Sequence, residues 1–515
     1  MVILPAMRRH SGPIAFGAVV AAALATTAVA QRGTSGLAEN FQRQLDVEDA
    51  EARQAYFRDT PISERLLLDA GGSFRYGFYE IQTPRSQDQF LQQPDLRLYV
   101  RAELDGAHRF FGRLRLEYNE WDFNGTRGFG PDTSEEGWQD PIGEIYWYEF
   151  DLAGLMASQG GAAPPDFNVV VKGGRQYFIW ASGLVLSNYL YAGLVDLTLG
   201  DFTLSGLYGA TAGHDTVDFD TSRPGYDYNT DRNYLGGKIE YRGLAEHRPY
   251  VYYLAQYDGN GGQYNVVQPG VLGGVPTTYN YDSQYLGVGS MGSIGADLVY
   301  RVEFVQQWGT TLSDPLNRNP VFNAATLAAG QPLAVPQQQS SISAQAGLAG
   351  LTWLARNDMD LRLDGQFVIG SGDPNRLDSG TTFGGIAPRN TDHAFNSNGY
   401  VNTGLALAPL PTNLAIPSVG LSLNPFPSNS TLKNVRYGVT GYVFNKLVSN
   451  APISVLTRPG VPYIGGEIDQ SLDWRISSDL NFNLRYGIFL PHKDAFFPGE
   501  GKIRQFFYVG LTYAF

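Results

Sequence analysis

The sequence predicts an all-β protein, a transmembrane antiparallel up-and-down β-barrel of roughly 16 to 18 strands. From residue 65 onward apolar and polar side chains alternate with the period of two that strands have. The links between these stretches are alternately short and long, which is typical of barrels in the bacterial outer membrane. After the N-terminus no apolar run reaches the about 18 residues that a membrane-spanning helix needs.

Residues 1–30 have the organisation of a secretory signal peptide. Arg8 and Arg9 form its basic region, residues 14–28 form a short apolar core, and Ala28-Val29-Ala30 is a small-x-small cleavage site. The chain is therefore expected to be exported.

Residues 31–64 are polar and mixed in charge, and we expect a short periplasmic helix or a loose tail. The barrel is expected to occupy residues 65–515. The formal net charge of −13 argues against nucleic-acid binding, because an acidic protein repels phosphates. The absence of cysteine is compatible with an oxidising compartment.

The strands follow one another along the chain by their alternation. The first covers residues 65–79, and the short Asp105–His108 link after the second is typical of a hairpin. The later expected strands are 95–105, 110–118, 142–151, 167–178, 188–199, 201–211, 232–243, 249–257, 283–292, 296–308, 341–356, 359–370, 399–408, 432–445, 463–477, 479–490 and 503–515.

The strand at 399–408 rests on parity. If both ends of the barrel are periplasmic, the number of strands must be even, and this requires one strand between residues 371 and 432. Residues 400–409 alternate best, so we place it there. The Pro-rich stretch 409–430 then becomes a long periplasmic turn.

The final strand ends the chain on a phenylalanine. Phe507, Val509, Leu511, Tyr513 and Phe515 share one face. An amphipathic strand ending in Phe resembles the closing strand of bacterial outer-membrane barrels.

The two faces of the strands differ in kind. One is dominated by apolar residues and the other carries charges in strand after strand, which lipid outside and water inside explain better than a soluble sandwich does. The arginines of the water-facing phase are candidates either for cross-strand ion pairs or for contacts with carboxylates of a solute. The candidate substrate path consists of Arg97, Arg101, Arg113, Arg115, Arg175, Arg301, Arg362, Arg475 and Arg485.

The chain carries little that indicates catalysis, so we expect no enzyme and no cofactor. No histidine after residue 30 has a serine two positions later, as an outer-membrane phospholipase would need, and no phosphate-binding loop or zinc spacing is present. An acidic loop with Asp215, Asp218 and Asp220 is a weak candidate Ca²⁺ site, and a solvated loop without a bound metal explains it better.

Three stretches of the last third resemble the alginate-export family of outer-membrane proteins. They are 366–374, which ends in a Ser-Gly-Asp turn, His393-Ala-Phe395, and 466–496. Lys172-Gly-Gly-Arg175-Gln176 is similar to an earlier strand of that family. The resemblance implies an 18-stranded barrel that passes an anionic polysaccharide such as alginate through an arginine-rich pore.

The resemblance also implies outer-membrane lipid and periplasmic secretion-complex proteins as partners. The alternative is a general or substrate-specific porin for small anionic solutes. A polymer exporter needs gates at both mouths, whereas a porin usually folds one long loop into its lumen. A third possibility is an adhesin or scaffold barrel with a closed lumen, which would not conduct.

Overall fold

A computed structural model describes residues 66–84, 89–104, 106–123, 137–160, 166–213, 218–220, 223, 230–260, 262–267, 274–315, 335–376 and 385–515. The expected signal peptide (1–30) and periplasmic segment (31–64) lie outside the described residues, and both stay predictions.

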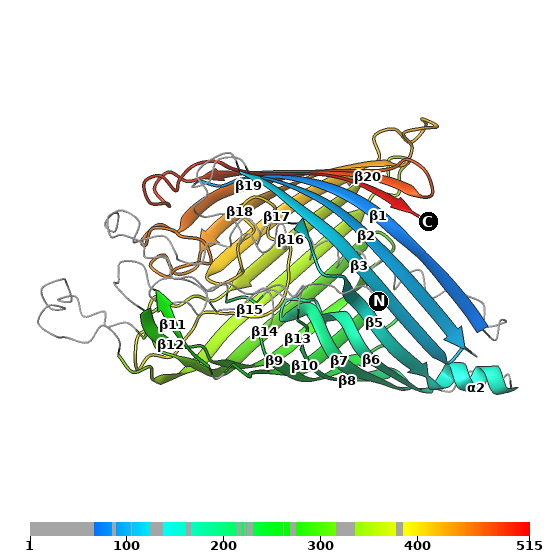
Figure 1. Cartoon of the computed structure of the whole chain (residues 1–515), viewed down its shortest axis with the longest axis horizontal. Coiled ribbons are helices and arrows are strands. Elements are labelled where there is room, and N and C mark those ends of the chain that lie inside the picture. The colour runs from blue at the N-terminus through cyan, green and yellow to red at the C-terminus, as the bar shows by residue number, and fades with distance from the viewer. Residues whose placement is uncertain are drawn as a thin grey trace, which may run out of the picture.

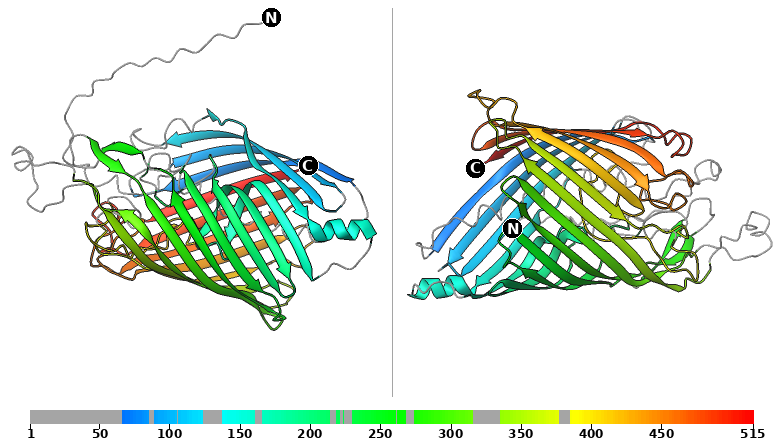
Figure 2. Two further views of the ribbon diagram at one scale, coloured as in Figure 1. Left: turned by 90° about the horizontal axis from the view of Figure 1, so that it is seen from below. Right: turned by 180° about the vertical axis from the view of Figure 1, so that it is seen from behind.

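The strands form one closed antiparallel barrel (Figures 1 and 2). Strand β1 (Leu66–Gln82) pairs with β2 (Gln89–Leu104) on one side and with β21 (Arg504–Ala514) on the other, so the sheet has no open edge there. The 19-stranded sheet consists of 18 barrel strands and the two-residue strand β4 (Gly137–Trp138), which pairs with β3. The expected fold class is confirmed.

The remaining barrel strands follow in chain order around the circle. They are β3 (His108–Phe123), β5 (Ile142–Asp151), β6 (Phe167–Trp180), β7 (Leu186–Leu199), β8 (Phe202–Thr211), β9 (Arg232–Tyr241), β10 (His247–Asp258), β13 (Tyr281–Ile294), β14 (Leu298–Leu312), β15 (Gln339–Leu354), β16 (Arg362–Gly370), β17 (Leu414–Leu423), β18 (Val435–Lys446), β19 (Tyr463–Arg475) and β20 (Leu480–Pro491).

The two rims of the barrel differ. Helix α2 (Leu152–Gly160) and the C-terminus lie at the rim of short turns, and the hairpin of β11 (Gln263–Val267) and β12 (Gly274–Thr278) lies at the rim of long loops (Figure 1). In outer-membrane barrels the short turns are periplasmic. We orient the barrel accordingly, so that the long loops are extracellular.

The outer wall is apolar. Leu68 on β1 and Val419 on β17 are 69% and 68% exposed, and Val100 and Val288 are also exposed. A closed barrel satisfies its backbone groups internally, so such a wall is suited to lipid. In the part of the chain that the structure describes, no helix is long and apolar enough to span a membrane.

The expected strand at 399–408 is wrong. This stretch is irregular, and the fourteenth barrel strand is β17, which lies inside the stretch expected to be a Pro-rich turn. Proline has no backbone N–H to donate to a neighbouring strand. Pro417 is tolerated in β17 because the pairing with β18 skips Ile416 and Pro417, while the pairing with β16 is continuous. The even strand count was right, and the placement failed because the apolar side chains of 405–407 are buried without forming a strand.

Candidate functional site

A long loop folds into the barrel. Between β16 and β17 the chain leaves the extracellular rim, and its described residues 392–413, here called the inward segment, contact side chains that point into the lumen. At its start Asp392 is buried and forms an ion pair with Arg376. Burial alone lowers the pKa of the Arg376 guanidinium, but Asp392 outweighs this effect and raises the pKa, so the pair stays charged.

The inward segment is hydrogen-bonded to the wall near β7 and β14. Asn398 pairs as a bridge with Leu186, and its carbonyl accepts the backbone N–H of Ser187 at 2.9 Å. Asn396 and Gln307 exchange two hydrogen bonds, of 2.9 and 3.2 Å. These contacts satisfy backbone groups that have no sheet partner, as buried backbone must.

Residues 405–407 of the inward segment are hydrogen-bonded to β19. The Glu467 carboxylate accepts the backbone N–H groups of Leu405, Ala406 and Leu407 at 2.6, 2.7 and 2.9 Å. Asp469 accepts a further hydrogen bond from Leu405 N–H at 3.1 Å. Successive N–H groups that converge on one point form an anion-binding concavity. In this protein the Glu467 carboxylate occupies that concavity.

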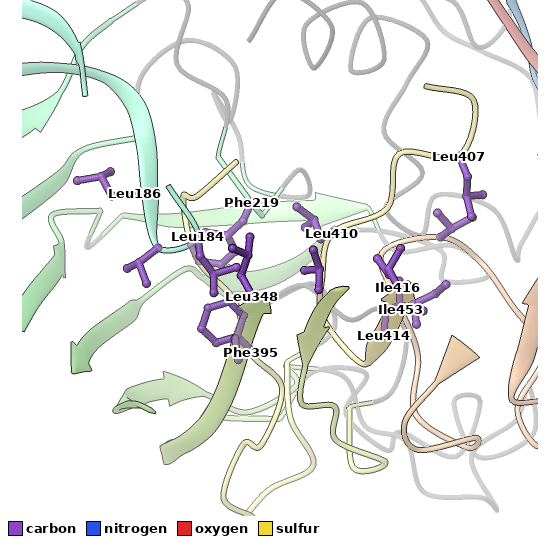
Figure 3. Packing of buried hydrophobic residues seen from close by; sticks show 14 of the residues in the cluster. Leu184, Leu186, Phe219, Leu348, Phe395, Leu407, Leu410, Leu414, Ile416 and Ile453 are labelled. Carbon is purple, nitrogen blue, oxygen red and sulfur yellow. The ribbon is translucent and has the colours of Figure 1, made fainter. Parts of the chain in front are cut away.

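Apolar side chains hold the same segment between these anchors (Figure 3). Phe395, Leu407 and Leu410 belong to one buried cluster with Leu186 of β7 and with Ile453, which lies between β18 and β19. Strands β7 and β19 lie on nearly opposite sides of the 18-strand circle. Since the same segment also contacts Gln307 on β14 and Gln366 on β16, it lies inside the lumen and narrows it.

The first three strands present a wall of arginines to the lumen, here called the arginine wall: Arg75, Arg97, Arg101, Arg113 and Arg115. Asp95 lies between Arg75 and Arg97, with N–O distances of 2.8 and 3.1 Å. Arg101 pairs with Glu103 at 2.9 Å. Four of the nine expected substrate-path arginines are therefore brought together on one wall.

Glu144 on β5 joins three of these arginines. One carboxylate oxygen lies 3.4 Å from Arg97 and 3.9 Å from Arg115, and the other contacts Arg113. The Glu144 side chain is completely buried. Sequence reasoning did not select Glu144, because a β-bulge takes it out of the alternation that was used.

Arg175 lies on β6, outside the arginine wall. Its guanidinium donates to the backbone carbonyls of Glu144 at 3.0 Å and Gly213 at 2.6 Å, and to Tyr191 at 3.3 Å. These contacts hold the bulged part of β5 against β6. Whether Arg175 also contacts a solute stays a prediction.

The other four expected arginines lie on β14, β16, β19 and β20, outside the three strands of the arginine wall. Arg301 on β14 is exposed, and it donates to Gln366 at 2.7 Å, which in turn donates to Asn402 of the inward segment. Arg362 is 46% exposed and pairs with Asp364. Arg485 on β20 pairs with Asp473 at 2.8 Å, and Arg475 is exposed at the periplasmic end of β19.

The wall opposite β2 carries an acidic group. Glu303 on β14, half-way around the circle, accepts hydrogen bonds from Tyr250 at 2.6 Å and Tyr252 at 2.9 Å, and from Ser182 N–H at 3.1 Å. Glu303 thus adds a buried negative charge to the wall opposite β2, two residues from Arg301 on the same strand.

The acidic loop does not form a metal site in its described part. Arg232 donates to both carboxylate oxygens of Asp218, and Arg223 lies 3.6 Å from the same carboxylate. The described residues include no cluster of three or more His, Cys, Asp or Glu side chains that could hold a metal ion. Asp220 is buried beside this pair, and Asp215 lies outside the described residues.

The closed barrel, its apolar outer wall and its charged lumen define an outer-membrane β-barrel protein of the bacterial cell envelope. Among solved structures, the chain is similar to OccAB1 of Acinetobacter baumannii, with a TM-score of 0.50 and 9% identity over 87% of this chain and 96% of that one. It is also similar to OccK8 (OprE) of Pseudomonas aeruginosa, with a TM-score of 0.50 and 11% identity over 87% of this chain and 98% of that one.

At such low identity these likenesses show the fold, which is that of outer-membrane porins. No family model matches the sequence, and no curated protein matches it. The resemblance to the alginate-export family is thus supported as far as an outer-membrane barrel and no further.

Proposed function

We propose that the protein is a non-enzymatic outer-membrane channel for small anionic solutes, with carboxylates as the preferred class. The arginine wall carries this proposal. Guanidinium groups bind carboxylates through paired N–H donors, and a row of them along one wall offers successive binding positions.

The inward segment favours small solutes over a polymer. It is one long loop inside the lumen, anchored near β7 and at β19, which is the arrangement expected of a porin. Export of an anionic polysaccharide such as alginate is the second candidate, because the same arginine wall suits uronic acids. Secretion-complex partners belong to that second candidate alone.

Planar-bilayer recording of the purified barrel tests the proposal. We expect a reversal potential in a KCl gradient that shows anion preference, and current blocks by succinate and by glucuronate but not by glucose. Exchange of Arg97, Arg113 and Arg115 for Gln should remove most of that preference. Equal blocking by glucose and glucuronate would contradict the proposal. Blocking by oligouronates together with passage of them into vesicles would favour the polysaccharide candidate.

The same experiment separates a channel from a scaffold, because a barrel with a closed lumen conducts no ions. We also propose that residues 1–30 direct export and that 31–64 remain in the periplasm. Mass spectrometry of the mature protein, which should begin at Gln31, tests the first of these.

A further inference from the structure

Two arginines face each other across adjacent strands. Arg97 on β2 is directly opposite Arg115 on β3 in the antiparallel register. Like charges in such a pair destabilise the sheet. The side chains are 9% and 8% exposed, so water screens them poorly. Asp95 lies 3.1 Å from Arg97 and Glu117 lies 3.4 Å from Arg115, and Glu144 is the carboxylate that contacts both arginines.

Strand β5 supplies this shared carboxylate through a bulge. Arg113 is paired with Ile145 and the next residue, Leu114, is paired with Gly143, so Glu144 is the extra residue of β5. Glu144 and Ile145 are consequently both buried, which regular alternation would not allow. Arg175 fixes the bulge by donating to the Glu144 carbonyl at 3.0 Å.

The contacts of Glu144 are those of a bound carboxylate. Arg97 and Arg115 approach one oxygen at 3.4 and 3.9 Å, Arg113 contacts the other, and the Tyr189 hydroxyl donates to the first at 3.5 Å. A solute carboxylate could take the same three guanidinium groups only if the displaced Glu144 carboxylate turns toward the water of the lumen.

We propose that Glu144 is a specificity-determining residue: it occupies a carboxylate-binding site formed by Arg97, Arg113 and Arg115, and solutes bind there by displacing it. This inference rests on the proposed function. A resident competitor weakens each binding event, and a channel conducts only if a solute that binds also leaves. Glu144 thereby weakens the binding of anions enough for them to leave the site and pass through the channel.

The first test compares Glu144→Gln with the control Glu149→Gln. Glu149 lies on the same strand and pairs with Arg109 at 2.7 Å and Lys172 at 3.8 Å, outside the cluster. Both exchanges add one positive charge to the wall. Only Glu144→Gln should lengthen succinate block times, by roughly tenfold, the effect of one charge-assisted contact. Equal lengthening in both variants, or none in either, would overturn the inference.

The second test uses a small carboxylate to replace the missing one. We expect 100 mM acetate, relative to 100 mM chloride, to raise the unfolding temperature of Glu144→Ala and to leave the wild type and Glu149→Ala unchanged. Unfolding is followed by the loss of the heat-resistant folded band on gels. If Glu144→Ala does not fold in chloride, refolding is repeated in acetate, which should restore the folded band.

These readouts separate the two proposals. Acetate that fails to stabilise or refold Glu144→Ala overturns the carboxylate site whatever the channel conducts. A wild-type channel without anion preference refutes the proposed function, while acetate rescue would still report the site.

Discussion

The Leu405 backbone N–H donates to the Glu467 carboxylate at 2.6 Å and thereby joins the inward segment to strand β19 of the barrel wall. Two further N–H groups, those of Ala406 and Leu407, end on the same carboxylate. One buried side chain thus positions the narrow part of the lumen. The predictions below test this anchor, the electrostatics of the lumen and the lipid-facing wall.

Glu467→Gln should loosen the inward segment. The amide keeps the size of the side chain but replaces one acceptor oxygen with an NH₂ group, and a buried backbone N–H that loses its acceptor costs about 1–3 kcal/mol. We expect higher single-channel conductance or new flickering between levels in bilayer recordings. Asp473→Asn is the matched control, because Asp473 lies on the same strand and pairs with Arg485 instead. Identical traces for Glu467→Gln and the wild type would show that the anchor does not set the aperture.

Gly487→Ala should disturb the same anchor from the neighbouring strand. A Cβ atom there would lie 2.7 Å from Asp469 Oδ1 and 2.8 Å from Leu405 Cβ, which is too close for either contact. The 405–407 turn must shift, so conductance should change in the same sense as in Glu467→Gln. At Gly441 a Cβ atom would meet nothing within 4 Å, and Gly441→Ala should conduct as the wild type does.

Arg301→Gln should reduce anion preference more than Arg362→Gln does. Arg301 is linked through Gln366 to Asn402 of the inward segment, whereas Arg362 pairs with Asp364 near the periplasmic rim. Salt screens charges beyond about 10 Å at 0.1 M, so a charge next to the narrow part has the larger effect. Reversal potentials measured at 0.1 M and 1 M KCl check this, since the difference between the variants should shrink at the higher concentration.

Val419→Lys should destabilise the barrel in lipid. The side chain is 68% exposed in the middle of β17 on the outer wall. A lysine on the lipid face near the midplane costs about 2–4 kcal/mol. Equilibrium unfolding by urea in phospholipid vesicles measures the loss, and Val419→Leu serves as the control. A lysine variant as stable as the wild type would mean that this face does not meet acyl chains.

Alternation along the strands determined the barrel, the number of its strands and the identity of the arginine wall. Each of these depends on the period of two, which is visible in a single chain. Arg97, Arg101, Arg113 and Arg115 could be assigned to one face because their strands are regular up to the β5 bulge. Glu467 and Asp469 lie in a stretch that resembles the alginate-export family, but their role as an anchor was not visible there.

Tertiary structure alone decided where residues 392–413 go and which carboxylate the arginines share. The apolar 405–407 run alternates like a strand, yet its N–H groups bind Glu467, a residue of β19 that is remote in sequence. Glu144 escapes any periodic pattern because a bulge adds one residue to β5. The sequence alone determined which face of most strands is wet, whereas contacts between segments far apart in the chain determined how the wet space is narrowed and charged.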